Sequence, residues 1–193
     1  MAFEQVRKLG SSNFFRTGVP SVVIEGWGEN SMATDFVFVY GANMSRSELR
    51  AWLEGSGHNS SLVLSAKIAT LSGYDYVWNY YSRGRGCGTA NLEPKENAIV
   101  WGILLEIDES LLKEFDRKEG HPYFYSRGTK RVPVRIVGNG QIVQAWLYLA
   151  ESNKTAGKDV RPSRDYKGLL VAAAEYWGFP GDYIDRMRQW DTQ

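Results

Sequence analysis

Residues 36–44 read FVFVYGANM. The first five of these residues are apolar, β-branched or aromatic, which predicts a strand that is buried on both faces. Gly41 ends this strand. Ser45 and Glu48 then form a capping-box pattern, and apolar residues at helical spacing follow from Leu49. We therefore expect a buried strand that turns through a glycine into a helix.

Patterns on the C-terminal side of this unit predict the remaining elements. Strands are expected over residues 62–71, 74–81 and 99–105, with a glycine-rich turn at 84–88. A long hairpin closed by Gly138-Asn139-Gly140 is expected to join residues 123–137 to 141–150. Helices are expected over residues 108–115, with an end near Gly120, and over residues 163–177 and 182–190. This order of elements predicts an α+β fold, with a barrel-like mixed β-sheet and a few flanking helices.

The N-terminal stretch differs in pattern from the rest of the chain. Its Gly, Ser, Pro and charged residues surround one short apolar run, VVI at residues 22–24, which could form an edge strand. We expect an N-terminal arm over residues 1–35 and a single domain over residues 36–193.

Composition excludes several classes of protein. The chain has 193 residues, of which 43% are hydrophobic, and this is enough for one packed domain. A formal net charge of +1 gives no reason to expect nucleic acid or a membrane surface as a partner. The single cysteine, Cys87, rules out an intrachain disulfide and favours a reducing compartment. No transmembrane run and no secretory signal are visible, so a cytoplasmic location is predicted.

The sequence also lacks the common catalytic motifs. Its only histidines, His58 and His121, do not pair with Cys87 at zinc-ligand spacing, so no metal site is expected. There is no G-x-S-x-G turn, and the S-x-x-K match at residues 110–113 is explained by the leucines of an amphipathic helix. The sequence GRGCG at 84–88 is too short for a dinucleotide loop, and no helix follows it. We therefore expect neither a metal nor a cofactor.

Four segments, in this order, resemble the γ-glutamylcyclotransferase family. They are YGANM at 40–44, close to Y-G-S-N-[LM]; GTANL at 88–92, ahead of VWG at 100–102; FDRKEG at 115–120, similar to L-D-x-x-E-G; and PSRDY at 162–166 with GFPGDY at 178–183. Each motif alone is weak, but together they span about residues 36–190 in the family's order. The resemblance implies a γ-glutamylcyclotransferase-like fold.

The resemblance also implies a reaction. The family cleaves γ-glutamyl amides without water: the substrate's own α-amine attacks the side-chain carbonyl and releases 5-oxoproline with a free amine or amino acid. Intramolecular attack of this kind has a large effective molarity, on the order of 10⁵ M. An acyltransferase or lyase of this type carries its nucleophile in the substrate and needs no metal. The substrate could come from glutathione turnover or be a γ-glutamyl-capped biosynthetic intermediate.

Glu119 is the residue to which the resemblance assigns the proton shuttle. A carboxyl at a helix end beside Gly120 and aromatic residues would be partly desolvated, and its pKa would rise toward neutrality. The residues alone leave open another interpretation, in which Glu119 is one more solvated charge in a charged helix end.

The resemblance assigns the substrate cradle to Tyr40, Gly41, Ala42, Asn43 and Met44. A glycine turn between a strand and a helix offers free backbone N–H groups, which favour the glutamyl α-carboxylate. Ala42 stands where the family has serine, so a backbone contact would survive there and a hydroxyl contact would not.

Tyr125 corresponds to a pocket tyrosine of the family, and Tyr123 is the alternative two residues earlier. Arg83 or Arg85 could pair with a second substrate carboxylate. The expected partners are a small-molecule γ-glutamyl substrate and, as in relatives, a second copy of the chain in a homodimer. A different class of function stays open: a catalytically idle fold relative that binds a small metabolite or a protein. A 5-oxoproline release assay discriminates the two.

Overall fold

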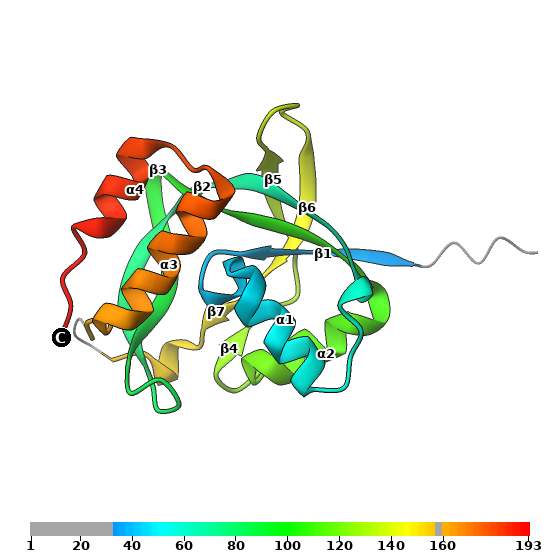
Figure 1. Ribbon diagram of the computed structural model, residues 1–193, viewed down its shortest axis with the longest axis horizontal. Coiled ribbons are helices and arrows are strands. Elements are labelled where there is room, and N and C mark those ends of the chain that lie inside the picture. The colour runs from blue at the N-terminus through cyan, green and yellow to red at the C-terminus, as the bar shows by residue number, and fades with distance from the viewer. Residues whose placement is uncertain (1–32, 157–159) are drawn as a thin grey trace, which may run out of the picture. The chain divides into compact units, whose positions relative to one another are not determined.

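The computed structural model describes residues 33–156 and 160–193. Within them, five strands close into a barrel in the order β1-β3-β2-β5-β6 (Figure 1). Strand β1 runs antiparallel to β3 and parallel to β6, so the sheet is mixed. The predicted α+β fold with a barrel-like mixed sheet is therefore confirmed. These strands are β1 (Thr34–Val39), β2 (Val63–Ser82), β3 (Cys87–Asp108), β5 (Val132–Ile136) and β6 (Ile142–Leu147).

The expected N-terminal arm lies almost entirely outside the described residues, and so does its apolar run at 22–24. The first described strand, β1, starts at Thr34 and pairs with β3 from that residue onward. Val37 and Phe38 are both almost completely buried. Because successive side chains of a strand point to opposite faces, β1 is buried on both faces, as predicted. The strand predicted from FVFVY is thus present, and it ends one residue before Tyr40.

Strands β2 and β3 form one long hairpin, where the sequence predicted shorter separate strands. The expected break between residues 71 and 74 is instead a register shift within β2, at Gly73 with φ +81°. Such a bulge bends a strand without ending it. Residues 87–98 of β3 were not predicted as a strand because they include Pro94 and several charges, and residues 93–97 are exposed. The expected glycine-rich turn does close this hairpin.

Two of the four helices in the described residues begin at the predicted N-caps. Ser45 accepts a hydrogen bond from the Glu48 amide, and Ser163 accepts one from the Tyr166 amide. The helix expected over 108–115 instead starts with a 3₁₀ turn over Glu109–Leu111, and the α-helix itself runs over Leu112–Glu119. Gly120 ends the second helix in the left-handed conformation, with φ +67°. A Cβ at Gly120 would also lie 2.5 Å from the Phe124 ring. The positive φ and this close approach both favour glycine at position 120. These helices are α1 (Arg46–Gly55), α2 (Leu112–Glu119), α3 (Arg164–Trp177) and α4 (Gly181–Arg188).

The predicted long hairpin forms only in its inner half. Strands β5 and β6 pair across the Gly138-Asn139-Gly140 turn, but the flanking residues leave the barrel. They make a separate two-stranded sheet of β4 (Tyr125–Ser126) and β7 (Leu149–Ala150), which lies next to α2 (Figure 1). This departure from the barrel brings Tyr125 close to the C-terminal end of α2. None of the helices in residues 33–156 and 160–193 is both long and apolar enough to cross a bilayer.

Candidate active site

A cavity of about 430 Å³ opens where β1 passes into α1. Its walls are the loop after β1, the end of α2, the turn between β2 and β3, and the start of α3. Each of the four segments singled out in the sequence contributes to the lining, although they are far apart in the chain. The polar residues of the lining are Tyr40, Asn43, Tyr80, Ser82, Arg85, Thr89, Arg117, Lys118, Glu119, Tyr125, Tyr148 and Tyr166.

Gly41, Ala42 and Asn43 form the cavity wall that follows β1. The chain turns there through a short 3₁₀ helix, η1 (Ala42–Met44), whose first bond runs from the Met44 amide to the Gly41 carbonyl over 2.9 Å. The amides of residues 41–43 have no hydrogen-bond acceptor among the described residues, as expected at the start of such a turn. They can therefore receive an anion. Anion binding by these amides would not need a side-chain hydroxyl at Ala42.

Tyr40 and Met44 hold this loop from its two ends. Tyr40 lines the cavity, but its hydroxyl is committed to the Tyr148 carbonyl at 2.7 Å, and burial raises its pKa well above the usual value. Met44 is almost fully buried and does not line the cavity. Its carbonyl accepts a hydrogen bond from the Trp177 indole at 2.8 Å. Of the five predicted cradle residues, Met44 alone lies outside the cavity.

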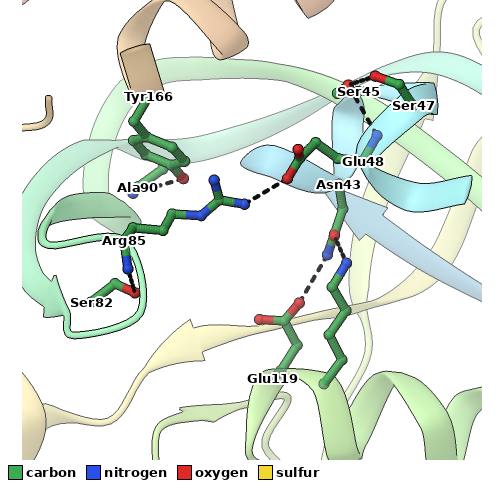
Figure 2. A network of polar contacts seen from close by, with 10 residues as sticks. Asn43, Ser45, Ser47, Glu48, Ser82, Arg85, Ala90, Glu119 and Tyr166 are labelled. Atoms are coloured by element: carbon green, nitrogen blue, oxygen red, sulfur yellow. Dashed lines mark hydrogen bonds and ion pairs between the residues drawn. The ribbon is translucent and has the colours of Figure 1, made fainter. Parts of the chain in front are cut away.

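Glu119 is the last residue of α2, and its side chain points into the cavity toward Asn43 (Figure 2). Its Oε1 accepts a hydrogen bond from Asn43 Nδ2 at 2.8 Å. Burial raises the pKa of Glu119, and the opposing effects of Lys118, of the Asn43 bond and of Arg85 do not cancel this rise. The solvated-charge interpretation fits its neighbour Arg117, whose side chain is 75% exposed, and does not fit Glu119.

Lys118 also faces the cavity, which sequence reasoning missed when it treated this residue as part of a solvated charged run. Its ammonium donates to Asn43 Oδ1 and lies 4.4 Å from the centre of the Trp52 ring. Burial lowers the pKa of Lys118 to about 8. The sequence feature that could have identified Lys118 as a cavity residue was its position within FDRKEG at 115–120, next to Glu119.

Tyr125 lines the cavity, whereas Tyr123 is 72% exposed. The Tyr125 hydroxyl donates to the Ala90 carbonyl at 3.0 Å and lies 3.2 Å from Thr89 Oγ1. Burial raises the pKa of Tyr125, so the phenol is neutral in the range where proteins work. It is available as a hydrogen-bonding group and not as a base.

Tyr166 reaches the cavity from the first turn of α3. Its hydroxyl accepts a hydrogen bond from the Ala90 amide at 3.4 Å, and its hydroxyl oxygen would lie 3.5 Å from a Cβ placed on Gly41. The segment before α3 is anchored by Gly88, whose amide donates to the Arg161 carbonyl at 3.0 Å. A Cβ at Gly88 would lie 1.5 Å from the Val160 carbonyl oxygen, so only glycine permits this approach.

Arg85 lines the cavity from the turn between β2 and β3. Its Nη2 donates to Glu48 Oε2 at 2.8 Å, and its guanidinium lies over the Tyr166 ring at 5.1 Å (Figure 2). Arg83, the other arginine considered from the sequence, is exposed and does not line the cavity. His121 does not line it either; its ring packs edge-on against Tyr148.

The fold and this cavity can be compared with known proteins. The family model described as "Gamma-glutamyl cyclotransferase, AIG2-like" matches residues 37–168, which is more than half of the 193 residues. The chain belongs to this family. A Methanocaldococcus jannaschii protein named "Putative gamma-glutamylcyclotransferase" is 32% identical over 77 residues, which are 40% of the present chain and 62% of that protein. The match thus spans less than two thirds of that γ-glutamylcyclotransferase relative.

Solved structures show the γ-glutamylcyclotransferase fold directly. One of a γ-glutamyl cyclotransferase superimposes with a TM-score of 0.68 at 19% identity, over 83% of the present chain and 90% of that chain. An uncharacterized human protein gives 0.67 at 20% identity, over 83% and 89%. The yeast γ-glutamyl cyclotransferase specific to glutathione gives 0.57 at 10% identity, over 80% and 94%. At these identities the likeness is one of fold.

The arrangement can support proton transfer beside a bound anion. The free amides of residues 41–43 can bind the anion, and the Glu119 carboxyl, with its raised pKa, can exchange a proton close by. No three His, Cys, Asp or Glu side chains lie close enough to hold a metal ion in residues 33–156 and 160–193.

Proposed function

We propose that the protein is a γ-glutamylcyclotransferase that cleaves a γ-glutamyl amide and releases 5-oxoproline. The observation that carries the proposal is the pairing of Glu119 with the loop of Gly41, Ala42 and Asn43 in one cavity. A carboxyl with a raised pKa lies one hydrogen bond away from a loop that has free amides. A γ-glutamyl group carries the matching pair, an α-carboxylate and an α-ammonium on the same carbon.

In this proposal the substrate carboxylate binds the amides of the loop, and its ammonium faces Glu119. The carboxylate of Glu119 takes one proton from the ammonium and leaves a free amine. The amine nitrogen then bonds to the γ-carbonyl carbon and closes a five-membered ring. Glu119 gives its proton to the leaving nitrogen as the original amide bond breaks. The ring nitrogen gives up its remaining surplus proton to Glu119, which passes it to the released amine, so the products are 5-oxoproline and a free amine in its ammonium form. General acid–base catalysis of this kind contributes about 10² to 10⁴-fold.

The proposed reaction requires neither a metal nor a cofactor, because the nucleophile is part of the substrate. The enzyme's contribution is to hold the amine against the carbonyl, and the effective molarity of such an arrangement is on the order of 10⁵ M or more. The neutral phenols of Tyr125 and Tyr166 then face the bound group as hydrogen-bonding partners rather than as bases.

In this proposal the leaving group extends toward Arg85. A cationic side chain at that end of the cavity favours a substrate whose leaving group carries a second carboxylate. Arg85 lines the cavity and is held by Glu48 at 2.8 Å, in a pair that is partly exposed on both sides. A substrate carboxylate could replace Glu48 as the partner of Arg85. A γ-glutamyl amino acid or peptide has such a group, whether it comes from glutathione turnover or from a biosynthetic pathway.

The experiment is a screen of γ-glutamyl amino acids, peptides and amines with the purified full chain, in which 5-oxoproline is measured by mass spectrometry. We expect release from at least one compound, no release from its N-acetyl derivative, and unchanged turnover in EDTA. Free glutamate as the first product would show hydrolysis and exclude the mechanism. Binding of the panel without any release would identify a catalytically idle relative.

A further inference from the structure

Lys118, Asn43 and Glu119 form a chain of two hydrogen bonds through one side-chain amide. Lys118 donates to Asn43 Oδ1, and Asn43 Nδ2 donates to Glu119 Oε1 at 2.8 Å (Figure 2). The two links join adjacent residues at the end of α2 to the loop after β1. A protonated lysine has three N–H donors and no acceptor. The amide atom that it meets must therefore be the carbonyl oxygen, which leaves the NH₂ group to face Glu119.

The orientation of the Asn43 amide decides which form of Glu119 is favoured. An asparagine amide turned by half a revolution occupies nearly the same space. In that orientation the carbonyl oxygen would face Glu119, and only a protonated carboxyl could hydrogen-bond to it. In the observed orientation an N–H donor faces Glu119, which favours the ionised form. The ionised form is the one that can accept a proton from an ammonium.

We propose that Lys118 is a positioning residue that fixes the Asn43 amide and so keeps a hydrogen-bond donor on Glu119. The catalytic meaning of this inference rests on the proposed function, because it concerns the same carboxyl. The surroundings of Lys118 suit the role. Its ammonium lies 4.4 Å from the centre of the Trp52 ring, and Trp52 belongs to α1, which follows the Asn43 loop directly. The Lys118 side chain thus connects α2, which carries both Lys118 and Glu119, to α1, which continues from the Asn43 loop.

Direct charge effects are the competing explanation, since a cation next to Glu119 favours its ionised form without any help from Asn43. Other groups act on this pair as well, and they are present in all four proteins of a mutant cycle. Those facing Glu119 or Lys118 are Glu48 on α1, Arg85 on the β2–β3 turn, Tyr40, Tyr80, Tyr125, Tyr148 and Tyr166. A double-mutant cycle cancels their contributions and isolates the Lys118–Asn43 coupling.

The cycle consists of wild type, Lys118→Met, Asn43→Ala and the double variant. Hydrogen bonds to charged groups are worth about 1.5–3 kcal/mol, so loss of the donor should lower kcat roughly 10- to 100-fold. We expect Lys118→Met to have this effect when Asn43 is present and less than about a threefold effect when Asn43 is alanine. Lys118→Arg, which keeps a charged donor, should restore most of the activity. Lys113→Met, a change of an exposed cation on the same helix that does not line the cavity, should leave activity unchanged.

Titration of the Glu119 carboxyl by ¹³C NMR provides a readout that does not depend on turnover. Lys118→Met should raise the pKa of Glu119 more in the presence of Asn43 than in the Asn43→Ala background. Equal shifts in both backgrounds, or equal falls in kcat, would show that Lys118 acts by charge alone and would overturn the inference. If no γ-glutamyl compound is turned over, the proposed function fails, while the NMR cycle still decides the role of Lys118. Thermal unfolding of each variant checks that it is folded.

Discussion

The phenol of Tyr148 donates a hydrogen bond to Asp116 Oδ1 over 2.6 Å, and this bond joins two walls of the Glu119 cavity. Tyr148 lies between β6 and β7, while Asp116 lies on α2, one helical turn before Glu119. Arg127 adds two bonds to the same carboxylate, at 2.7 and 3.1 Å. The three residues together fix the direction from which the end of α2 enters the cavity.

The first prediction is that Asp116→Asn lowers stability. Burial alone would raise the pKa of Asp116, but hydrogen bonds from Arg127 and Tyr148 outweigh it and hold the pKa below 3.8. A carboxylate with a depressed pKa stabilises the fold above its unfolded pKa and loses this effect as the pH falls through the folded value. Denaturant unfolding near neutral pH should therefore show a loss of about 1–3 kcal/mol.

This loss should shrink as the pH is lowered below the ordinary range of aspartate. Asp185→Asn is the control, because its side chain is 62% exposed and its ion pair with Arg188 lies on the surface. A loss at Asp116 that is the same in acid as at neutral pH would contradict the assignment of the stabilisation to the charged carboxylate.

The second prediction concerns turnover by Glu119→Gln. This change keeps the shape of the side chain and removes the proton acceptor, so kcat should fall by about 10² to 10⁴-fold with a much smaller change in KM. Glu114→Gln is the matched control on the same helix, because Glu114 does not line the cavity and pairs with His58, which does not line it either. Asp116 is unsuitable as a control because it holds Tyr148 and Arg127. Near-normal kcat for folded Glu119→Gln would exclude the proposed shuttle.

The third prediction is that Glu119→Gln does not destabilise the protein at neutral pH. Burial raises the pKa of Glu119 above 4.5, so the folded protein binds this proton more tightly than the unfolded chain. Between the unfolded and folded pKa values, stability from this group decreases as the pH rises. Glutamine does not ionise, so the variant should be at least as stable as wild type above that window and should lose this advantage below it. Thermal unfolding as a function of pH measures the difference.

Lower stability of Glu119→Gln than of wild type at mildly alkaline pH would mean that the carboxylate is stabilised overall in the fold. The raised pKa would then be wrong, and with it the physical basis for Glu119 as a base near neutrality.

The fourth prediction concerns the leaving group. If Arg85 binds a second substrate carboxylate, wild type should prefer a γ-glutamyl amino acid to the same compound with its terminal carboxylate converted to an amide. A charge-assisted pair contributes about 1.5–3 kcal/mol, so Arg85→Met should remove a preference of roughly tenfold or more in kcat/KM. Arg83→Met is the control on the same turn, since Arg83 is exposed and outside the cavity. An equal preference in wild type and Arg85→Met would rule out this role.

The extent to which the sequence predicted the fold differs between local and long-range features. Helix α3 was predicted from Ser163 to Gly178, and both caps are present. The strand after residue 35 and the end of α2 at Gly120 were predicted with similar success. The bulge at Gly73 was taken for a strand end, because the difference lies in the pairing with β3 and not in the local residues.

The candidate site shows the same division. The sequence by itself determined the ends of the helices and the turn after β1, because a cap or a tight turn depends on residues within three or four positions of each other. It also predicted that the helix before Glu119 ends near Gly120, and in the structure Glu119 is the last residue of that helix. Only the tertiary structure decided that Lys118 reaches Asn43 while the side chain of Arg117 stays 75% exposed. It also decided that Tyr125 rather than Tyr123 lines the cavity. The Asn43–Glu119 bond joins residues 76 positions apart, so it exists only once the barrel has closed and α2 has packed against it.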